Sequence, residues 1–226
     1  MKQNSVIVLL VALLICLALE SPNSSFARSH GLVTPDVNRA SDIPYPIDTM
    51  ASGLVTLSLY LGAAGQVQNV QVLRDIPSLT NPANMAVNSW TFTPATLEGS
   101  PVPSTLNVSV VFNPGKLQNQ SLNLPPVQAT TPPNPPGFLP PEISAASYAA
   151  YPVNSVATGA VVLDVTVDKR GQITKVTVIR GVPALTSQAI TAVKTWTIDP
   201  ARFNGRAITA KVIVAFVFRS PTITSP

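Results

Sequence analysis

The chain has 226 residues, of which 46% are hydrophobic and 11% are charged; it contains 23 prolines and has a formal net charge of +4. This composition is typical of a packed globular protein with uncharged, proline-rich connections, and the length suits one large domain or two small ones. A single histidine, His30, and a single cysteine, Cys16, are too few for a zinc site of cysteine and histidine ligands.

Residues 1–27 have the pattern of a signal peptide. Lys2 is followed by an apolar run over residues 6–19, and Ser25 and Ala27 place small residues at positions −3 and −1 for cleavage. The run is shorter than the about 20 residues that a membrane-spanning helix needs. We therefore expect export to the periplasm; an uncleaved segment would instead anchor the chain in the inner membrane. Cleavage would remove Cys16, and export without disulfides fits a bacterial periplasm.

Two copies of one unit make up most of the chain, at residues 45–113 and 151–219. A shift of 106 residues places the Tyr-Pro pair, the tryptophan and the Pro-Ala pair of one copy on those of the other without a gap. Residues 28–44 form a linker before the copies, residues 114–150 a proline-rich linker between them, and residues 220–226 a tail. We expect the proline-rich linker to be an extended polyproline-II spacer, with packing across a domain as the alternative.

The same strands are predicted in both copies. Apolar and polar residues alternate over 161–167, and leucine and valine recur in the same way over 55–61, which predicts a half-buried strand. Gly65 and Gly171 follow, and each marks a hairpin turn with positive φ. The remaining predicted strands cover residues 67–74 and 173–180 directly after the turns, and residues 104–113 and 210–219 at the ends of the copies.

A short helix is predicted between the second and the last strand of each copy. In the second copy its apolar stripe is Ala189, Ala192, Val193 and Trp196, with Thr186 or Ser187 as the N-cap. In the first copy the stripe ends at Trp90, and Pro82 is expected in the first turn. The predicted fold class is α+β: two tandem small domains, each an antiparallel three-stranded sheet with a helix packed on one face, in the order strand–strand–helix–strand.

Acidic residues do not recur between the copies. Asp199 aligns with Thr93, and Asp164 aligns with Ser58. A catalytic pair of carboxylates in one copy would therefore be missing from the other. The glycine spacing also matches no phosphate-binding loop. We expect no enzymatic activity, no cofactor and no metal site.

The two copies differ in charge. Residues 45–113 carry one arginine against three acids, a net charge of −2, whereas residues 151–219 carry nine basic residues against three acids, a net charge of +6. The basic copy suits an anionic surface, such as lipid phosphates or an acidic protein face, although scattered solubilising charges give the same count. Nucleic acid is not an expected partner, because the chain is exported and its basic residues lack interleaved aromatic residues.

Both copies resemble the TonB C-terminal domain family. The resemblance rests on the Tyr-Pro start, the glycine hairpin turn, a valine-rich strand ending in arginine and the helix pattern Ala-x-x-Ala-Val-x-x-Trp. It continues with x-x-Pro-Ala, a glycine turn and a last strand that ends in phenylalanine. The resemblance implies a non-enzymatic periplasmic domain that binds the TonB box of outer-membrane transporters by adding this peptide to a sheet edge.

Carried over to this sequence, the resemblance places the docking edge on the last strand of each copy. The expected partner-binding residues are Ser104, Leu106, Val108, Val110 and Phe112 in the first copy, and Ala210, Val212, Val214, Phe216 and Phe218 in the second. Arg74 and Arg180, at the ends of the second strands, are either solvated or in contact with a partner. Both faces of the last strand of the second copy are apolar, which favours an edge that something covers.

Two functions remain open from the sequence. The first is a periplasmic TonB-like protein that binds extended segments of envelope proteins and is linked to energy-dependent transport. The alternative is a non-energised structural or adaptor protein of the cell envelope whose basic second copy contacts anionic polymers or lipids. The apolar N-terminal run lacks the histidine of energy transducers, which weakens the case for energy coupling. Domains of this type can also pair through strand edges, so a homodimer is a further alternative.

Overall fold

The computed structural model describes residues 31–114, 120–127 and 135–220. The expected signal segment and the tail from residue 221 lie outside the described residues. The described residues cluster into one compact unit that includes both copies. The protein is of the α+β class, as predicted, with the two tandem regions in a single unit.

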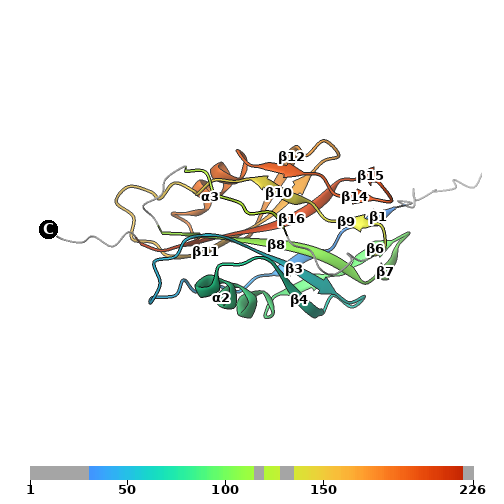
Figure 1. The fold of residues 1–226 in the computed structure, drawn as a ribbon, viewed down its shortest axis with the longest axis horizontal. Helices are drawn as coiled ribbons and strands as arrows, with labels where there is room; N and C mark the ends of the chain where they lie inside the picture. The colour runs from blue at the N-terminus through green and yellow to red at the C-terminus, as the bar shows by residue number, and fades with distance from the viewer. Residues whose placement is uncertain (1–30, 115–119, 128–134, 221–226) are drawn as a thin grey trace, which may run out of the picture. The chain divides into compact units, whose positions relative to one another are not determined.

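A six-stranded sheet forms the centre of this unit (Figure 1). Its strands, in chain order, are β3 (Gly53–Leu61), β4 (Val67–Arg74), β8 (Ser104–Asn113), β11 (Gly159–Val167), β12 (Ile173–Arg180) and β16 (Ala210–Phe218). Their spatial order is β12-β11-β16-β8-β3-β4. The first copy therefore supplies one half of the sheet and the second copy the other half.

The last strands of the two copies join the halves. β16 and β8 pair in parallel, with Ile213 opposite Val108 and Phe218 opposite Asn113, whereas all other pairs in this sheet are antiparallel. Because these two equivalent strands lie parallel in one sheet, a rotation of 180° about an axis along the strands relates one copy to the other. Each copy therefore presents its helix to the opposite face of the sheet.

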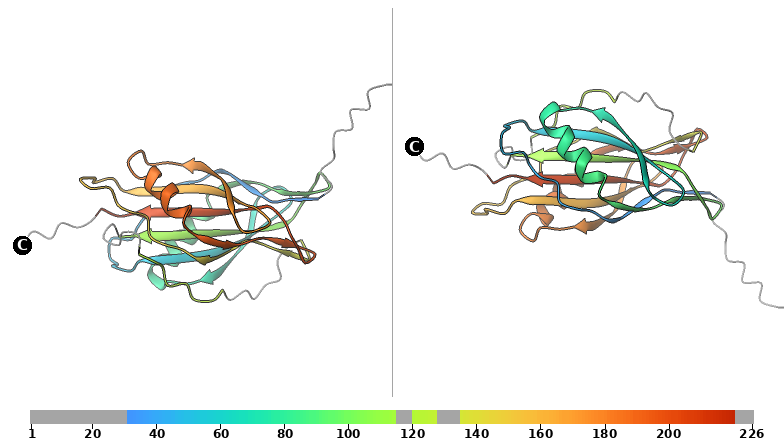
Figure 2. Two further views of the ribbon diagram at one scale, coloured as in Figure 1. Left: turned by 90° about the horizontal axis from the view of Figure 1, so that it is seen from above. Right: turned by 90° about the horizontal axis from the view of Figure 1, so that it is seen from below.

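The positions of the two helices agree with this symmetry. α2 (Pro77–Val87) and α3 (Thr186–Val193) lie on opposite faces, and Figure 2 shows α3 from one side and α2 from the other. Each packs an apolar stripe on the strands of its own copy, as predicted. The helices end at Val87 and Val193, so the buried Trp90 and Trp196 follow them rather than complete the helical stripe as expected. The Trp196 indole donates a hydrogen bond to the carbonyl of Ser147 at 3.2 Å.

The segments expected as linkers take part in the fold. β2 (Asp36–Arg39) pairs with β5 (Thr91–Thr93), and β10 (Glu142–Ala145) pairs with β13 (Thr197–Asp199). Short strands also join β1 (Leu32–Val33) to β6 (Ala95–Leu97) and β7 (Ser100–Val102), and β9 (Phe138–Leu139) to β14 (Arg202–Phe203) and β15 (Arg206–Ala207). Neither residues 31–44 nor the second linker from Phe138 onward is therefore a free spacer.

These segments cover sheet faces that the helices leave open. Val37 and Ile43 pack in one core with Ile213 of the second copy, while Ile143 packs in the other core with Val111 of the first copy. Each copy thus lends the segment before it to the other copy. The apolar residues on both faces of the last strands require this arrangement, since a helix covers one face only.

The predicted hairpin turns are confirmed, whereas two details of the predicted helices are wrong. Gly65 and Gly171 have φ of 82° and 81° and lie in the hairpin turns, as predicted. The predicted cap of α3 is wrong, because the N-cap is Leu185 and Thr186 is already helical; its hydroxyl instead bonds to Val182 on the preceding turn. Pro82 lies inside α2 rather than in its first turn, because the helix already begins at Pro77.

Candidate functional site

The expected docking residues on the last strands lie at the middle of the sheet. β8 is flanked by β3 and β16, and β16 by β8 and β11, so neither strand has an open edge in this arrangement. All residues of β8 are buried, and so are those of β16 except Lys211. The covering inferred from their apolar faces is thus supplied by the chain itself. Strand addition at these residues stays a prediction, and it would require β8 and β16 to separate.

The two arginines expected at a partner surface contact other parts of the same chain. The Arg74 side chain is 4% exposed and forms an ion pair with Glu142 at 3.2 Å. It also donates hydrogen bonds to the carbonyls of Pro125 at 2.9 Å and Ile143 at 3.1 Å. Burial lowers the pKa of Arg74, and the neighbouring Glu142 carboxylate opposes that effect.

Arg180 has an equivalent role in the second copy. Its guanidinium lies 3.5 Å from Asp42, which also accepts a hydrogen bond from the backbone of Ala160 at 2.8 Å. Each arginine therefore fastens the segment that precedes the other copy, because Glu142 lies before the second copy and Asp42 before the first. Their place in the fold is structural.

The outer edges of the sheet are β4 and β12. Within the described residues, β4 pairs with β3 only and β12 with β11 only. β4 carries uncharged side chains up to Arg74 at its end, and its Val72 is 38% exposed. β12 carries an exposed lysine, Lys175, near its start. Because lysine on an edge strand opposes further pairing, β4 is the more receptive edge.

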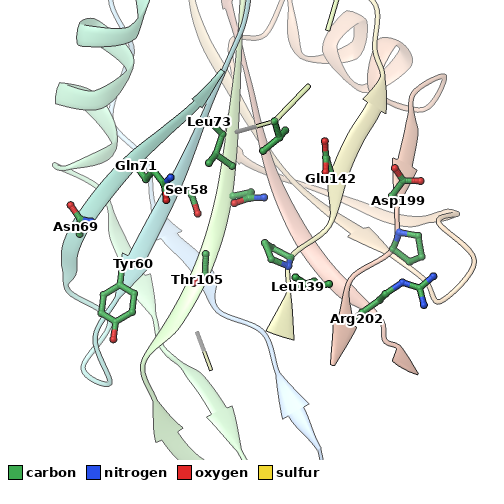
Figure 3. Close-up of a pocket in the computed structure, with 14 residues that line it drawn as sticks. Ser58, Tyr60, Asn69, Gln71, Leu73, Thr105, Leu139, Glu142, Asp199 and Arg202 are labelled. Carbon is green, nitrogen blue, oxygen red and sulfur yellow. The ribbon is translucent and has the colours of Figure 1, made fainter. Parts of the chain in front are cut away.

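A groove of about 280 Å³ lies on the face of the first copy that α2 does not cover (Figure 3). One wall consists of side chains on β3, β4 and β8: Ser58, Tyr60, Asn69, Gln71, Leu73, Thr105 and Asn107. The other wall consists of Val127 and side chains on or beside β9, β10, β13 and β14: Leu139, Pro140, Glu142, Asp199, Pro200 and Arg202. The groove therefore lies between the sheet of one copy and the covering segments of the other.

Asn107 is the most buried polar group of the groove. It is 7% exposed, and its amide nitrogen donates a hydrogen bond to the carbonyl of Pro141 at 3.3 Å. Its carbonyl oxygen is buried without a hydrogen-bond partner. Such an unpaired acceptor is unfavourable in a protein interior unless a donor reaches it.

The second copy has a cluster of charges in the equivalent place. Lys211 on β16 contacts Asp164 on β11 at 2.7 Å and also forms a short ion pair with Asp36 on β2. Burial raises the pKa of Asp164, and the hydrogen bond from Lys211 opposes this effect. Burial also acts to lower the pKa of Lys211, but the hydrogen bonds to both carboxylates outweigh it, and the pKa is raised.

No sequence pattern within a single copy indicates this groove. The signal was present in the comparison of the copies, since Lys211 aligns with Thr105 and Asp164 with Ser58. For catalysis, this difference between the copies argues only against a shared active site. The position of the groove also depends on β10 and β13 crossing from the second copy, which no local pattern indicates.

The described residues contain no group of three or more histidine, cysteine or acidic side chains suited to a metal ion. In the same parts of the chain, no helix is both long and apolar enough to cross a membrane.

A family model described as the C-terminal region of the Gram-negative bacterial TonB protein matches residues 45–114 and 147–220, more than half of the chain. The chain belongs to the TonB C-terminal domain family. The predicted resemblance and the tandem arrangement are thereby confirmed. The family consists of non-enzymatic interaction domains of the cell envelope. Comparison with curated proteins and with solved structures gives no match.

Proposed function

We propose that this TonB-like protein binds extended segments of other envelope proteins in the periplasm by adding them as a strand to β4. The observation that supports the proposal most directly is the sheet order, in which β8 and β16 occupy each other's edges and β4 lies at an outer edge. TonB boxes of outer-membrane transporters are the first segments to test. Strand addition needs no cofactor. It also needs no coupling to energy-dependent transport, which is therefore not part of this proposal.

The character of β4 agrees with this role. Backbone groups give an added strand its affinity, and side chains at alternate positions give it specificity. On the α2 side of the sheet, Val70 and Val72 provide apolar contacts, whereas Asn69 and Gln71 face the groove. A matching segment would therefore alternate apolar and polar residues.

The two copies provide a matched pair of variants. Val72→Lys places a charge on the proposed edge, and Val178→Lys places the same charge at the equivalent position of β12, where Val178 is 41% exposed. We expect Val72→Lys to raise the dissociation constant of bound TonB-box peptides about tenfold or more, because lysine opposes edge pairing. Fluorescence anisotropy with labelled peptides measures the effect.

The control result is an unchanged affinity in Val178→Lys, since β12 already carries Lys175. Equal losses in both variants, or a loss in Val178→Lys alone, would contradict the assignment to β4. If none of the TonB-box peptides binds to the unmodified protein, transporter boxes are not its ligands.

The exposed charges of the second copy favour a second candidate, contact with an anionic envelope surface. Six basic side chains are exposed there: Lys169, Arg170, Lys175, Lys194, Arg202 and Arg206. The protein should then bind vesicles that contain anionic phospholipid, and added salt should weaken the binding. Lys175→Glu together with Lys194→Glu should reduce it further. Binding that is absent at low salt, or insensitive to both changes, would exclude this candidate.

A further inference from the structure

Two equivalent loops, residues 45–52 before β3 and residues 151–158 before β11, carry the most exposed large hydrophobic side chains of the described residues. They are Ile47 at 93% and Met50 at 78% exposed in the first copy, and Val153 at 85% and Val156 at 82% in the second. The 106-residue shift places the second pair on the first. The two loops, called the Tyr-Pro loops below, therefore expose apolar side chains at the same two positions.

The same hydrogen bonds hold each Tyr-Pro loop in place. The Tyr45 hydroxyl donates to the carbonyl of Ala51 at 2.6 Å, and the Tyr151 hydroxyl donates to the carbonyl of Ala157 at 2.7 Å. The amides of these two alanines donate to side-chain hydroxyls of their own loops, at 3.0 and 3.1 Å. The tyrosine of each Tyr-Pro pair thus fastens its loop. An ordered loop loses less conformational freedom on binding than an unordered one.

Both loops lie at one end of the six-stranded sheet. Gly53, after the first loop, pairs with Phe112 near the end of β8, and Gly159, after the second loop, pairs with Phe218 at the end of β16. Because β8 and β16 pair in parallel, their ends lie side by side. Figures 1 and 2 show both loops at the end of the sheet away from β7 and β15. The symmetry axis along the strands keeps the loops at nearly the same height, so one flat surface can contact both.

We propose that the two Tyr-Pro loops form a membrane-binding surface, which inserts its four apolar side chains into the interface of a phospholipid bilayer. Such side chains gain free energy when they leave water for the boundary between headgroups and acyl chains. The contact would hold the folded unit on a membrane without a spanning helix. It is independent of strand addition at β4, which uses an edge of the sheet rather than its end.

The small area of the four side chains favours a bilayer over a protein partner. An aliphatic side chain of this size buries on the order of 100 Å². A specific protein interface takes about 800 Å² from each partner and requires a matching shape. The loops offer far less area than that, and they offer it as separate tips. A fluid bilayer accepts separate apolar tips without a matching shape.

The distribution of charge favours a lipid without net charge. Asp48 is the one charged side chain within the Tyr-Pro loops, and Arg219 beside the first loop donates to the carbonyl of Thr49 at 2.7 Å. The exposed Lys169 and Arg170 lie in the hairpin at the opposite end of the sheet, where β11 ends beside the start of β16. The length of a strand therefore separates these basic residues from the loops. Insertion needs no anionic headgroup and should resist added salt.

A fluorescent label in one loop tests the proposal on the full chain. Val156→Cys with Cys16→Ser provides a single thiol for an environment-sensitive nitrobenzoxadiazole label, and Met85→Cys on α2 provides the control position. We expect phosphatidylcholine vesicles to raise the emission of the loop label severalfold and to shift it to shorter wavelength, with or without added salt. The label at residue 85 should keep its emission in buffer. It also accounts for contact through the apolar run at residues 6–19, which would leave both labels in water.

Two methionines provide matched variants of the labelled protein. Met50→Ser removes an apolar side chain from the first loop, and Met85→Ser removes one from α2; both side chains are exposed, so neither change opens a cavity. Met50→Ser should lower the response of the label at residue 156 severalfold at a given lipid concentration, because both loops insert together. Met85→Ser should leave the response unchanged. Thermal unfolding verifies that each variant folds.

Three results would overturn the proposal. The first is an equal response of the labels at residues 156 and 85, or no response of either. The second is a loop response that requires anionic phosphatidylglycerol and disappears with added salt, which would support the charge contact of the second copy instead. The third is a loop response that Met50→Ser leaves unchanged, since the first loop would then take no part.

Discussion

Asp164 illustrates at the residue scale how a buried charge in one copy becomes a polar groove in the other. Its side chain is 5% exposed; Oδ2 pairs with Lys211, and Oδ1 has no partner. Burial raises the pKa of Asp164 against the opposing effect of Lys211. A carboxyl group whose pKa rises on folding loses stabilising free energy as the pH increases through that folded pKa, because the folded state holds the proton more tightly than the unfolded state.

Asp164→Asn removes this titration. We expect the free energy of unfolding of the variant, relative to the unmodified protein, to increase as the pH rises from the ordinary aspartate value of 3.8 toward neutral. Urea unfolding at a series of pH values measures the difference. A relative stability of Asp164→Asn that is constant or falls with pH would contradict the raised pKa.

Individual residues of the groove could not be found from a single copy. Ser58 and Thr105 look like ordinary polar positions on a half-buried strand. Their role becomes clear only from a comparison with Asp164 and Lys211 and from the position of β10, in the segment before the second copy, across the groove. The groove depends on contacts between segments far apart in the chain, which periodicity does not encode.

At the scale of elements, the hairpin turns constrain the backbone most sharply. Gly171 has a positive φ, and a Cβ atom there would collide with the carbonyl oxygen of Ile198. Gly205 has a φ of 76°, yet a Cβ atom at that position meets nothing within 4 Å. A residue with a Cβ atom would therefore be strained by the positive φ at both positions, but it would collide with a neighbouring atom only at position 171.

Alanine at the two positions separates these effects. We expect Gly205→Ala to lower the free energy of unfolding by about 1 kcal/mol, since only the positive φ is penalised. Gly171→Ala should cost at least about 1 kcal/mol more, because the carbonyl of Ile198 must also move. Urea unfolding of both variants provides the comparison. Equal losses would show that the turn accommodates the added methyl group.

Local elements were the most predictable part of the fold. The alternation over 161–167 and the helical stripe ending at Trp196 follow from short-range periodicity, and the structure has a strand and a buried tryptophan there. The capping prediction failed because Thr186 bonds to the turn before α3 rather than to the first helical amides. The strand character of the linkers was missed, since their pairing partners belong to remote segments.

For the whole molecule, the apolar faces of the last strands explain the arrangement of the copies. Val214 and Ile213 point to opposite faces of β16, and both are fully buried in different cores. One helix cannot cover both faces, so each copy needs the covering segment of the other. The sequence indicated that something covers these strands, but not that they pair with each other in parallel.

Because β8 and β16 pair with each other, docking at β4 can be distinguished experimentally from docking at the last strands. A disulfide between Ser109→Cys and Val214→Cys, which are direct neighbours across β8 and β16, would lock the central pair of strands together. Cys16→Ser in the same chain prevents mispairing. Binding at β4 does not require the central strands to separate, whereas binding at β8 or β16 does.

The affinity of the locked protein for a TonB-box peptide, measured before and after reduction, tests this account most directly. Strand addition at β4 predicts the same dissociation constant in both states, with the loss in Val72→Lys preserved. Peptide binding that disappears in the oxidised protein and returns on reduction would contradict it, and would place the docking edge on the last strands.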